Sequence, residues 1–142
     1  MILCDVNVLL YAFRVDSERH QEYHAWLVEQ LTGAANVGVS ELVLSSFIRI
    51  CTHPRVYRIP SKPEESFAFA DAIRTSPNAV MVTPGARHWD IFRDLSQQCG
   101  ARGNLVPDAY LAALAIEWGC EWITTDRDYA RFQGLTWRHP LQ

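Results

Sequence analysis

The stretch NLVPDAYLAALAIEWGCEWITTDRD, residues 104–128, decides the fold of this chain. Its first half predicts a helix. Pro107 and Asp108 indicate the start, because proline is favoured in the first helical turn and a carboxylate is stabilised by the unpaired N–H groups there. Apolar side chains at helical spacing continue to Trp118, and Gly119 is typical of the left-handed residue at which a helix stops.

A short buried strand is expected directly after this helix. Residues 121–125 are rich in aromatic, β-branched and hydroxyl side chains, and they are followed by Asp126 and Asp128. A helix packed against its own strand brings the start of the helix and the end of the strand to one edge of an α/β sheet, where such folds bind ligands. We therefore expect Asp108, Asp126 and Asp128 to face one crevice.

The rest of the chain alternates short apolar runs with amphipathic helices. Strands are expected at residues 2–4, 37–40 and 79–82, with an edge strand at 135–137. Helices or helical turns are expected at 6–11, 18–31, 43–50, 67–73, 89–95 and 129–132. Asp16 and Ser17 are expected to cap the helix 18–31, and Ser61 with Glu64 forms a capping box for the helix that follows it. The alternation predicts one α/β domain over residues 1–142, with a mainly parallel sheet covered on both faces.

Composition restricts the kinds of protein this chain can be. Thirteen Lys and Arg against sixteen Asp and Glu give a net charge of -3, which argues against coating nucleic acid by bulk charge but allows a local basic rim. The four cysteines show no zinc-binding spacing, so free thiols in a reducing compartment are expected. No apolar stretch approaches the roughly 20 residues that span a bilayer, and no basic leader precedes the first strand. We expect a cytoplasmic protein that does not enter the membrane.

The acidic residues point to the chemistry. Asp5, Glu41 and Asp126 each follow an apolar strand, and Asp108 opens the helix before the last one. Parallel strands end at one edge of a sheet, and carboxylates gathered there repel one another unless a cation neutralises them. All-oxygen ligands favour Mg²⁺, with Mn²⁺ possible, over Zn²⁺. The sequence therefore predicts phosphoryl chemistry with Asp5, Glu41, Asp108 and Asp126 as catalytic acids, of which Asp5, Asp108 and Asp126 bind the metal.

Each of these positions also has a purely structural explanation. Any single acid at a helix start can be a cap, although capping explains Asp5 poorly because it directly follows a buried strand. Asn7 either orients Asp5 or caps the turn after it. Thr124 and Thr125 either hydrogen-bond a carboxylate of the site, as possible support, or reflect strand propensity. Arginines near the proposed edge either hold phosphates or are simply solvated: Arg49, Arg55, Arg58, Arg102, Arg127 and Arg131.

The chain resembles the PIN-domain ribonucleases, and within them the VapC-type toxins of bacterial toxin-antitoxin pairs. The resemblance extends over nearly the whole length and is most specific at the two ends. Its segments are ILCDVNVLLYA (2–12), SELVLSSFIRICTHPRV (40–56), NLVPDAYLAALAIEWG (104–119), TTDRDYARF (124–132) and LTWRHPL (135–141).

This resemblance implies a three-layer α/β/α sandwich, Mg²⁺-dependent endonucleolytic cleavage of RNA, a homodimer, and a VapB antitoxin whose C-terminal segment lies across the site. It implies that Asp5 and Asp108 are the principal metal ligands and that Asp126, with or without Asp128, completes an acidic quartet. One position departs from the family pattern. Many members carry their second acid where this chain has Ser46, so Glu41 either reaches the same metal or only caps its helix.

Two other functions remain open on the sequence alone. A strand closed by D-x-[DN]-x-[VT]-L also opens the haloacid-dehalogenase phosphatases and phosphotransferases, in which the first aspartate, here Asp5, attacks phosphorus. Those enzymes normally carry a second aspartate where this chain has Asn7 and a lysine after a later strand, whereas the only lysine here, Lys62, lies in a proline-flanked loop. The third possibility is a domain without catalytic activity that only binds a partner.

Overall fold

A parallel five-stranded sheet forms the centre of the protein. The computed structural model describes all residues from 1 to 142. The strands are β1 (Ile2–Cys4), β2 (Val37–Val39), β3 (Ala79–Met81), β4 (Glu121–Ile123) and β5 (Trp137–Arg138). They lie in the order β3-β2-β1-β4-β5, and every pairing is parallel. The predicted mainly parallel sheet is thus confirmed, and β1, which ends next to Asp5, lies at its middle.

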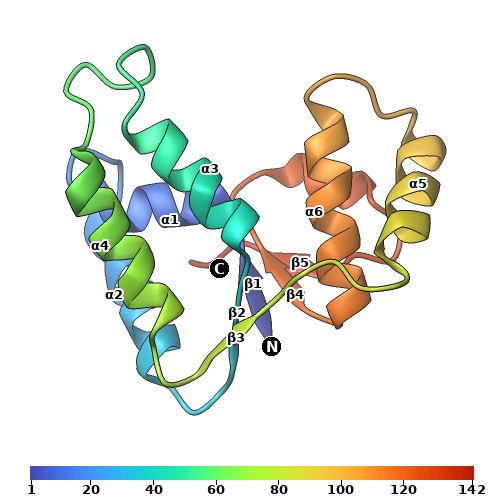
Figure 1. Ribbon diagram of the computed structural model, residues 1–142, viewed down its shortest axis with the longest axis horizontal. Helices are drawn as coiled ribbons and strands as arrows, with labels where there is room; N and C mark the ends of the chain where they lie inside the picture. Colours follow the sequence, from blue (N-terminus) through green and yellow to red (C-terminus); the bar gives the residue numbers. More distant parts are fainter.

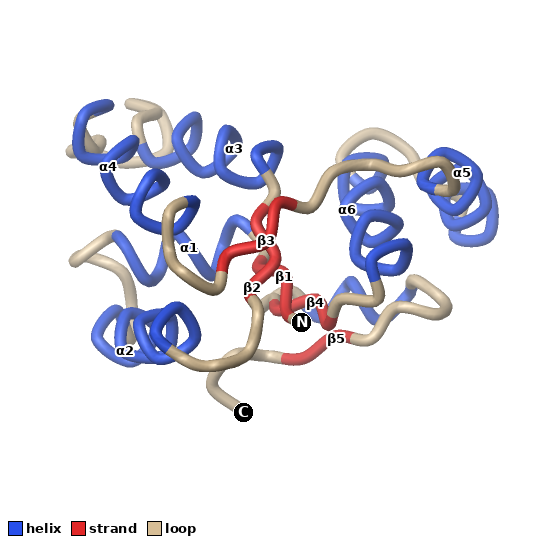
Figure 2. Tube along the Cα trace, turned by 60° about the horizontal axis from the view of Figure 1, so that its bottom comes forward, coloured by secondary structure: helices blue, strands red, loops and turns tan.

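Helices cover both faces of this sheet. They are α1 (Val6–Phe13), α2 (His20–Thr32), α3 (Glu41–Cys51), α4 (Pro63–Arg74), α5 (His88–Cys99) and α6 (Leu105–Trp118). A short 3-10 helix, η1, covers Arg127–Arg131. Figure 1 shows α1 to α4 on one side of the strands and α5 with α6 on the other, and Figure 2 shows the same division from a second direction. The three-layer α/β/α sandwich is therefore confirmed. No helix is long and apolar enough to cross a membrane.

The stretch of residues 104–128 packs as expected. Six residues of α6 are buried, four of them alanines, so the helix can lie close to its neighbours without side chains holding it off. Gly119 ends the helix at φ 64°, a left-handed conformation that glycine adopts without a steric penalty. The helix begins at Leu105, two residues before Pro107, so Pro107 and Asp108 lie within the first turn and do not open it. The edge strand likewise falls later than expected, at β5.

Two predicted helix caps are wrong, for a common physical reason. The helix expected from residue 18 begins at His20 without a side-chain cap, and α4 begins at Pro63, also without one. The side chains expected to cap them, Asp16 and Ser61, bind the guanidinium of Arg14 instead, at 2.6 Å and 3.0 Å. A buried guanidinium needs several acceptors, so this tertiary demand outweighs caps worth about 1 kcal/mol each.

Candidate active site

Asp5 lies where β1 ends and α1 begins, and it is 7% exposed. Its Oδ1 accepts a hydrogen bond from the backbone N–H of Val6 at 2.7 Å. A capping aspartate normally serves the second or third N–H of its helix, so this bond to the first N–H is not ordinary capping. The other oxygen, Oδ2, accepts bonds from Thr124 Oγ1 at 2.6 Å and Asn7 Nδ2 at 3.2 Å. Asp5 is therefore held in one orientation by residues of two different elements.

The support around Asp5 centres on Thr124, which is fully buried. Its hydroxyl donates to Asp5 and accepts from the backbone N–H of Asp126 at 3.0 Å. Asn7 bridges the same group, because its amide reaches Asp5 and its carbonyl oxygen accepts from the backbone N–H of Thr125 at 3.5 Å. The two threonines follow β4 directly, and only the side chain of Thr124 bonds to Asp5, whereas Thr125 contributes its backbone N–H.

Asp108 projects from the first turn of α6 towards Tyr129 of η1. The Tyr129 hydroxyl donates to Asp108 Oδ1 at 3.3 Å, and the tyrosine is 2% exposed, packed against Trp122 with ring centroids 5.3 Å apart. Sequence analysis missed Tyr129, because an aromatic residue in a short helical turn carries no signal that its hydroxyl faces an acid. The contact joins the start of α6 to the segment after β4, as predicted from the α/β topology.

Asp126 lies in the segment after β4, and its backbone N–H donates to the Thr124 hydroxyl that bonds Asp5. It caps η1, its Oδ1 accepting from the backbone N–H of Asp128 at 2.8 Å. The charge of Asp126 raises the pKa of both Asp5 and Asp108. Asp128 differs, because its side chain is 71% exposed and lies 3.7 Å from Arg131. The charge of Asp128 also raises the pKa of Asp108, so the structure brings both acids near Asp108, with the side chain of Asp128 the more exposed one at the rim.

Asp5, Asp108 and Asp126, which we call the acidic cluster, all act by their charges on the hydroxyl of Tyr129, which donates to Asp108 alone. Burial first, and then the charges of all three, raise the pKa of that hydroxyl. Burial also raises the pKa of Asp5 to about 6, against the hydrogen bonds of Thr124 and Val6, with the charges of Asp108 and Asp126 adding to the rise. The pKa of Asp108 is raised as well, mainly by burial. Like charges have therefore been gathered where water is scarce.

Glu41, the fourth predicted catalytic acid, faces another way. It is the first residue of α3, where Ser40 serves as the cap, and its carboxylate forms an ion pair with Arg74 of α4 at 3.1 Å. The Glu41 side chain is 65% exposed. Ser46 lies further along the same helix. The structure does not bring Glu41 to the three aspartates, so its catalytic role stays a prediction.

The donor set of the cluster fits a hard divalent cation. It offers only carboxylate oxygens, two of them on groups whose pKa is raised by burial and by neighbouring acids, so a positive charge there would relieve repulsion. No three Asp, Glu, His or Cys side chains come close enough to form a complete metal-binding group. Mg²⁺ does not require one, because it commonly keeps several waters and uses one or two carboxylates.

Comparison with known proteins identifies the family of this chain. Residues 2–135 match the family model of the PIN domain. VapC ribonuclease Mb2897 of Mycobacterium bovis and ribonuclease VapC43 of Mycobacterium tuberculosis are each 41% identical over 141 residues, covering 99% of this chain and 96% of the relative. Ribonuclease VapC25 of Mycobacterium tuberculosis is 39% identical over 135 residues, which is 95% of each chain.

Solved structures show the same fold at lower identity. VapBC-1 from nontypeable Haemophilus influenzae has a TM-score of 0.69 at 18% identity, covering 100% of both chains. VapBC2 from Rickettsia felis, bound to a promoter DNA fragment, has a TM-score of 0.68 at 19% identity, covering 98% of both chains. The family match and the full-length identity to the mycobacterial proteins together mean that this chain belongs to the PIN-domain family, among the VapC ribonucleases.

Proposed function

We propose that this protein is a Mg²⁺-dependent endoribonuclease and the toxic component of a VapBC-type toxin-antitoxin pair, acting on cellular RNA in the cytoplasm. One observation carries the proposal: hydrogen bonds of Thr124 and Tyr129 hold Asp5 and Asp108 against the segment after β4 that carries Asp126, at the carboxyl edge of a PIN-domain sheet. The relatives named as VapC ribonucleases favour a nuclease over the phosphotransferase that the Asp5 motif also allows. No Ser-His or Cys-His pair accompanies the acids to suggest another nucleophile.

The protein's own residues would prepare the site in two ways. Thr124 and Asn7 hold the Asp5 carboxylate in one orientation, and Tyr129 does the same for Asp108, so little ordering remains to be done when substrate binds. Because Asp5 is buried, the effective dielectric constant around it is lower than in water, so charge interactions made there are stronger. When bound by Asp5, Asp108 and Asp126, Mg²⁺ would neutralise the acids and supply the Lewis acidity that activates water and stabilises charge at phosphorus.

The proposed reaction is hydrolysis of one phosphodiester bond. A water oxygen bonds to phosphorus, the bond from phosphorus to the 3′ oxygen breaks, and that oxygen takes up a proton. The products are a 5′-phosphate and a 3′-hydroxyl. A 2′,3′-cyclic phosphate at the cut end would mean attack by the ribose hydroxyl and would refute this mechanism.

The partner assignment follows from the same comparisons. Structures similar in fold are VapBC complexes, so we propose a VapB-type antitoxin for this chain, and a homodimer as the resemblance implies. Size-exclusion chromatography with light scattering tests the dimer. Co-expression with a short reading frame found beside the gene tests the antitoxin, whose product should co-purify and suppress cleavage.

The decisive experiment compares RNA ends left by three purified proteins with and without Mg²⁺. Asp108→Asn should abolish cleavage while leaving the far-UV circular dichroism spectrum unchanged, because the amide keeps the shape of the side chain but loses its charge. Asp94→Asn is the matched control, since Asp94 is an exposed acid of α5 outside the cluster. Cleavage by Asp108→Asn at the wild-type rate, or intact RNA with the wild-type protein and Mg²⁺, would refute the proposed nuclease and would favour a domain that only binds a partner.

A further inference from the structure

Positive charge in this acidic protein is concentrated in one stretch. The chain carries -3 overall, yet residues 42–63 contain no Asp or Glu. Six of the thirteen Lys and Arg residues form ion pairs. Three of the other seven, Arg55, Arg58 and Lys62, are exposed on the segment between α3 and α4, and a fourth, Arg49, is exposed in the last turn of α3. We call residues 52–62 the basic arm.

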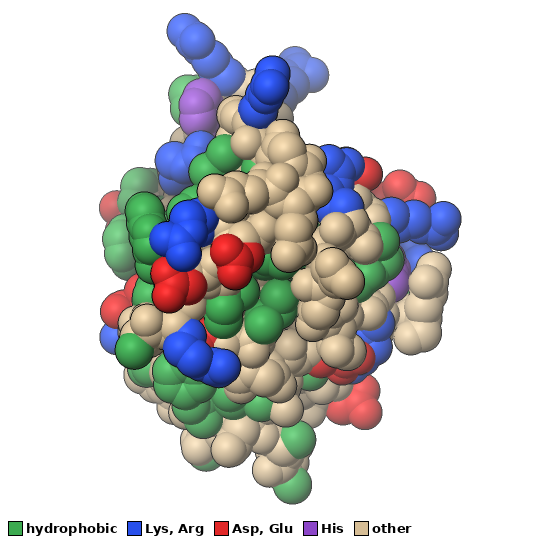
Figure 3. Space-filling model, turned by 90° about the vertical axis from the view of Figure 1, so that its right-hand side faces the viewer, with side chains coloured by type: hydrophobic (Ala, Val, Ile, Leu, Met, Phe, Trp, Pro, Cys, Tyr) green, Lys and Arg blue, Asp and Glu red, His purple; other side chains and the backbone are tan.

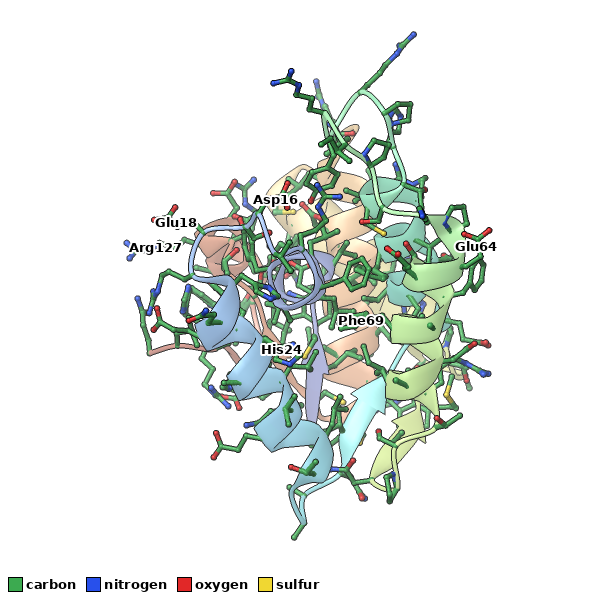
Figure 4. The ribbon with its side chains drawn as sticks, turned by 90° about the vertical axis from the view of Figure 1, so that its left-hand side faces the viewer. Asp16, Glu18, His24, Glu64, Phe69 and Arg127 are labelled. Carbon is green, nitrogen blue, oxygen red and sulfur yellow. The ribbon has the colours of Figure 1, made fainter.

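The basic arm projects from the molecule. Figure 1 shows it at the top left, between α3 and α4. Figure 3 shows blue cationic side chains and a purple histidine standing out at the top of the molecule, and Figure 4 shows long nitrogen-tipped side chains pointing outward at the same end. These positive charges are thus directed towards solvent, where a partner can reach them.

The arm is nevertheless held in place by a buried arginine. Arg14, 7% exposed, donates from Nη1 to the backbone oxygen of Ile59 at 2.9 Å and to Ser61 Oγ at 3.0 Å. Its Nε and Nη2 bind the carboxylate of Asp16 at 2.9 Å and 2.6 Å, and its guanidinium lies 3.9 Å from the centre of the Tyr57 ring. Two hydrogen bonds and a cation–π contact therefore fix three positions of the arm to one side chain, which Asp16 in turn holds by two more hydrogen bonds.

The base of the arm is closed independently of Arg14. The backbone N–H of Ser61 donates to the backbone oxygen of Cys51 at 2.8 Å, joining the two ends of the loop. Near the tip, the backbone N–H of Arg55 donates to His53 Nδ1 at 3.0 Å. A loop with few conformations loses little entropy when its side chains bind, so the exposed cations are preorganised.

Two helices connect the arm to the acidic cluster. Helix α1 runs from its N-cap, Asp5, to its C-cap, Arg14, and this corresponds to a rise of about 13 Å along the helix axis. Helix α3 begins at the end of β2, next to β1 in the sheet, and ends at the arm. Both helices therefore start at the carboxyl edge of the sheet and end at the arm. Arg14, which holds the arm, thus lies about 13 Å from Asp5 along α1, a length that corresponds to a few nucleotides of a bound strand.

We infer that the basic arm binds the sugar-phosphate backbone of RNA a few nucleotides from the cut, and that Arg14 is a positioning residue that holds it there. This inference rests on the proposed nuclease function and names where its substrate is gripped. RNA suits the arm better than a protein segment does. The guanidinium forks of Arg55 and Arg58 match phosphate oxygens, and no acid within residues 42–63 neutralises them.

The test measures binding of a fluorescent single-stranded RNA of about 20 nucleotides to proteins that all carry Asp5→Asn, so that the RNA is not cut. Arg55→Gln/Arg58→Gln should weaken binding about 10- to 30-fold at 0.1 M salt and lower the slope of log Kd against log salt by about 1.4, since each lost phosphate contact accounts for about 0.7. The matched control, Arg19→Gln/Arg93→Gln, removes the same charge from two exposed arginines elsewhere and should leave the slope unchanged.

Arg14→Lys tests the positioning role while keeping the charge. Lysine lacks the fork that joins Asp16 to the arm, so trypsin should cut after Arg55 or Arg58 more than about tenfold faster, and RNA binding should weaken at unchanged net charge. Faster cutting with unchanged RNA affinity would refute the role of Arg14.

The outcomes separate this inference from the proposed function. If the arm variant binds RNA with the slope of the control, the arm does not contact RNA, although cleavage by the wild-type protein would still support the nuclease. If the arm variant loses affinity for poly-glutamate and not for RNA, the arm is a docking surface for an acidic protein segment and the inference is wrong. If the wild-type protein leaves RNA intact while the arm variant lowers the slope, only the nuclease proposal falls.

Discussion

Replacing Asp5 by asparagine should make the metal-free protein more stable at neutral pH while destroying its proposed activity. The substitution keeps the size of the side chain and one of its two oxygens, which can still accept from the backbone N–H of Val6. It removes a negative charge that is buried near two other acids. Because that charge is useful only when a cation is bound, the metal-free fold should gain from its loss.

The magnitude follows from the raised pKa of Asp5. Folding moves this pKa from its ordinary 3.8 to about 6. A pKa difference of one corresponds to about 1.36 kcal/mol, so ionising Asp5 costs the folded state about 3 kcal/mol. Between these two values the folded protein binds more protons than the unfolded chain, so the contribution of Asp5 to stability is complete below about pH 4 and is lost as the pH rises through 6. About 2 kcal/mol of that loss falls between pH 4.5 and pH 7.5.

Urea unfolding in the presence of a chelator measures this quantity. The free energy of unfolding of the wild-type protein, minus that of Asp5→Asn, should fall by about 2 kcal/mol from pH 4.5 to pH 7.5. Added Mg²⁺ should restore stability to the wild-type protein at pH 7.5 and have little effect on the variant. Asp94→Asn should follow the wild-type curve throughout. If the wild-type and Asp5→Asn curves ran parallel across the pH range, Asp5 would not be a strained buried acid, and the argument for a cation at the cluster would lose its basis.

Three further predictions follow from the contacts around the cluster and the sheet. The acid limb of RNA cleavage should lie near pH 6 at low Mg²⁺, where Asp5 titrates, and should move to lower pH as Mg²⁺ competes with protons; a limb independent of Mg²⁺ would contradict metal binding at Asp5. Tyr129→Phe should lower the free energy of unfolding by about 1 kcal/mol. It should also shift the acid limb of cleavage to higher pH, because the hydrogen bond from the Tyr129 hydroxyl holds the pKa of Asp108 down and the variant lacks it. Glu117→Gln should cost about 1–3 kcal/mol in urea unfolding, because Glu117 accepts from the backbone N–H groups of Gly85 and Arg87 at 2.6 Å and 2.9 Å; an unchanged midpoint would show that these bonds add nothing.

The architecture could be predicted from the sequence because its signals are local. Three-residue apolar runs alternate with helical periodicity, and the parallel sheet and its two helical layers follow from that alternation. Cap positions were less predictable. Asp16 and Ser61 have the right residue type and position for caps, but each has a stronger partner in Arg14, which is near them only in the folded chain.

The residues of the candidate site show the same difference between local signals and contacts made only in the folded chain. Asp5 and Asp126 could be placed together because both follow strands of one parallel sheet, and backbone topology alone fixes that edge. Glu41 satisfies the same rule, yet its side chain pairs with Arg74, an arginine 33 positions later that no strand-end pattern anticipates. Topology determines where a Cα lies, but the direction of a side chain depends on which charges the tertiary fold brings within reach.

This distinction bears on which acids the proposed reaction uses. Glu41→Gln should leave cleavage almost unchanged if the ion pair with Arg74 reflects the working state, since its carboxylate then serves α3 and α4 and not the cluster. If instead Glu41→Gln abolished cleavage as Asp108→Asn should, the glutamate must leave Arg74 when substrate or metal binds. Arg74→Gln separates these cases, because it should leave cleavage unchanged in the first and raise it, by freeing Glu41, in the second. Cleavage rates at saturating Mg²⁺ for the two variants therefore decide whether the cluster works with three acids or four.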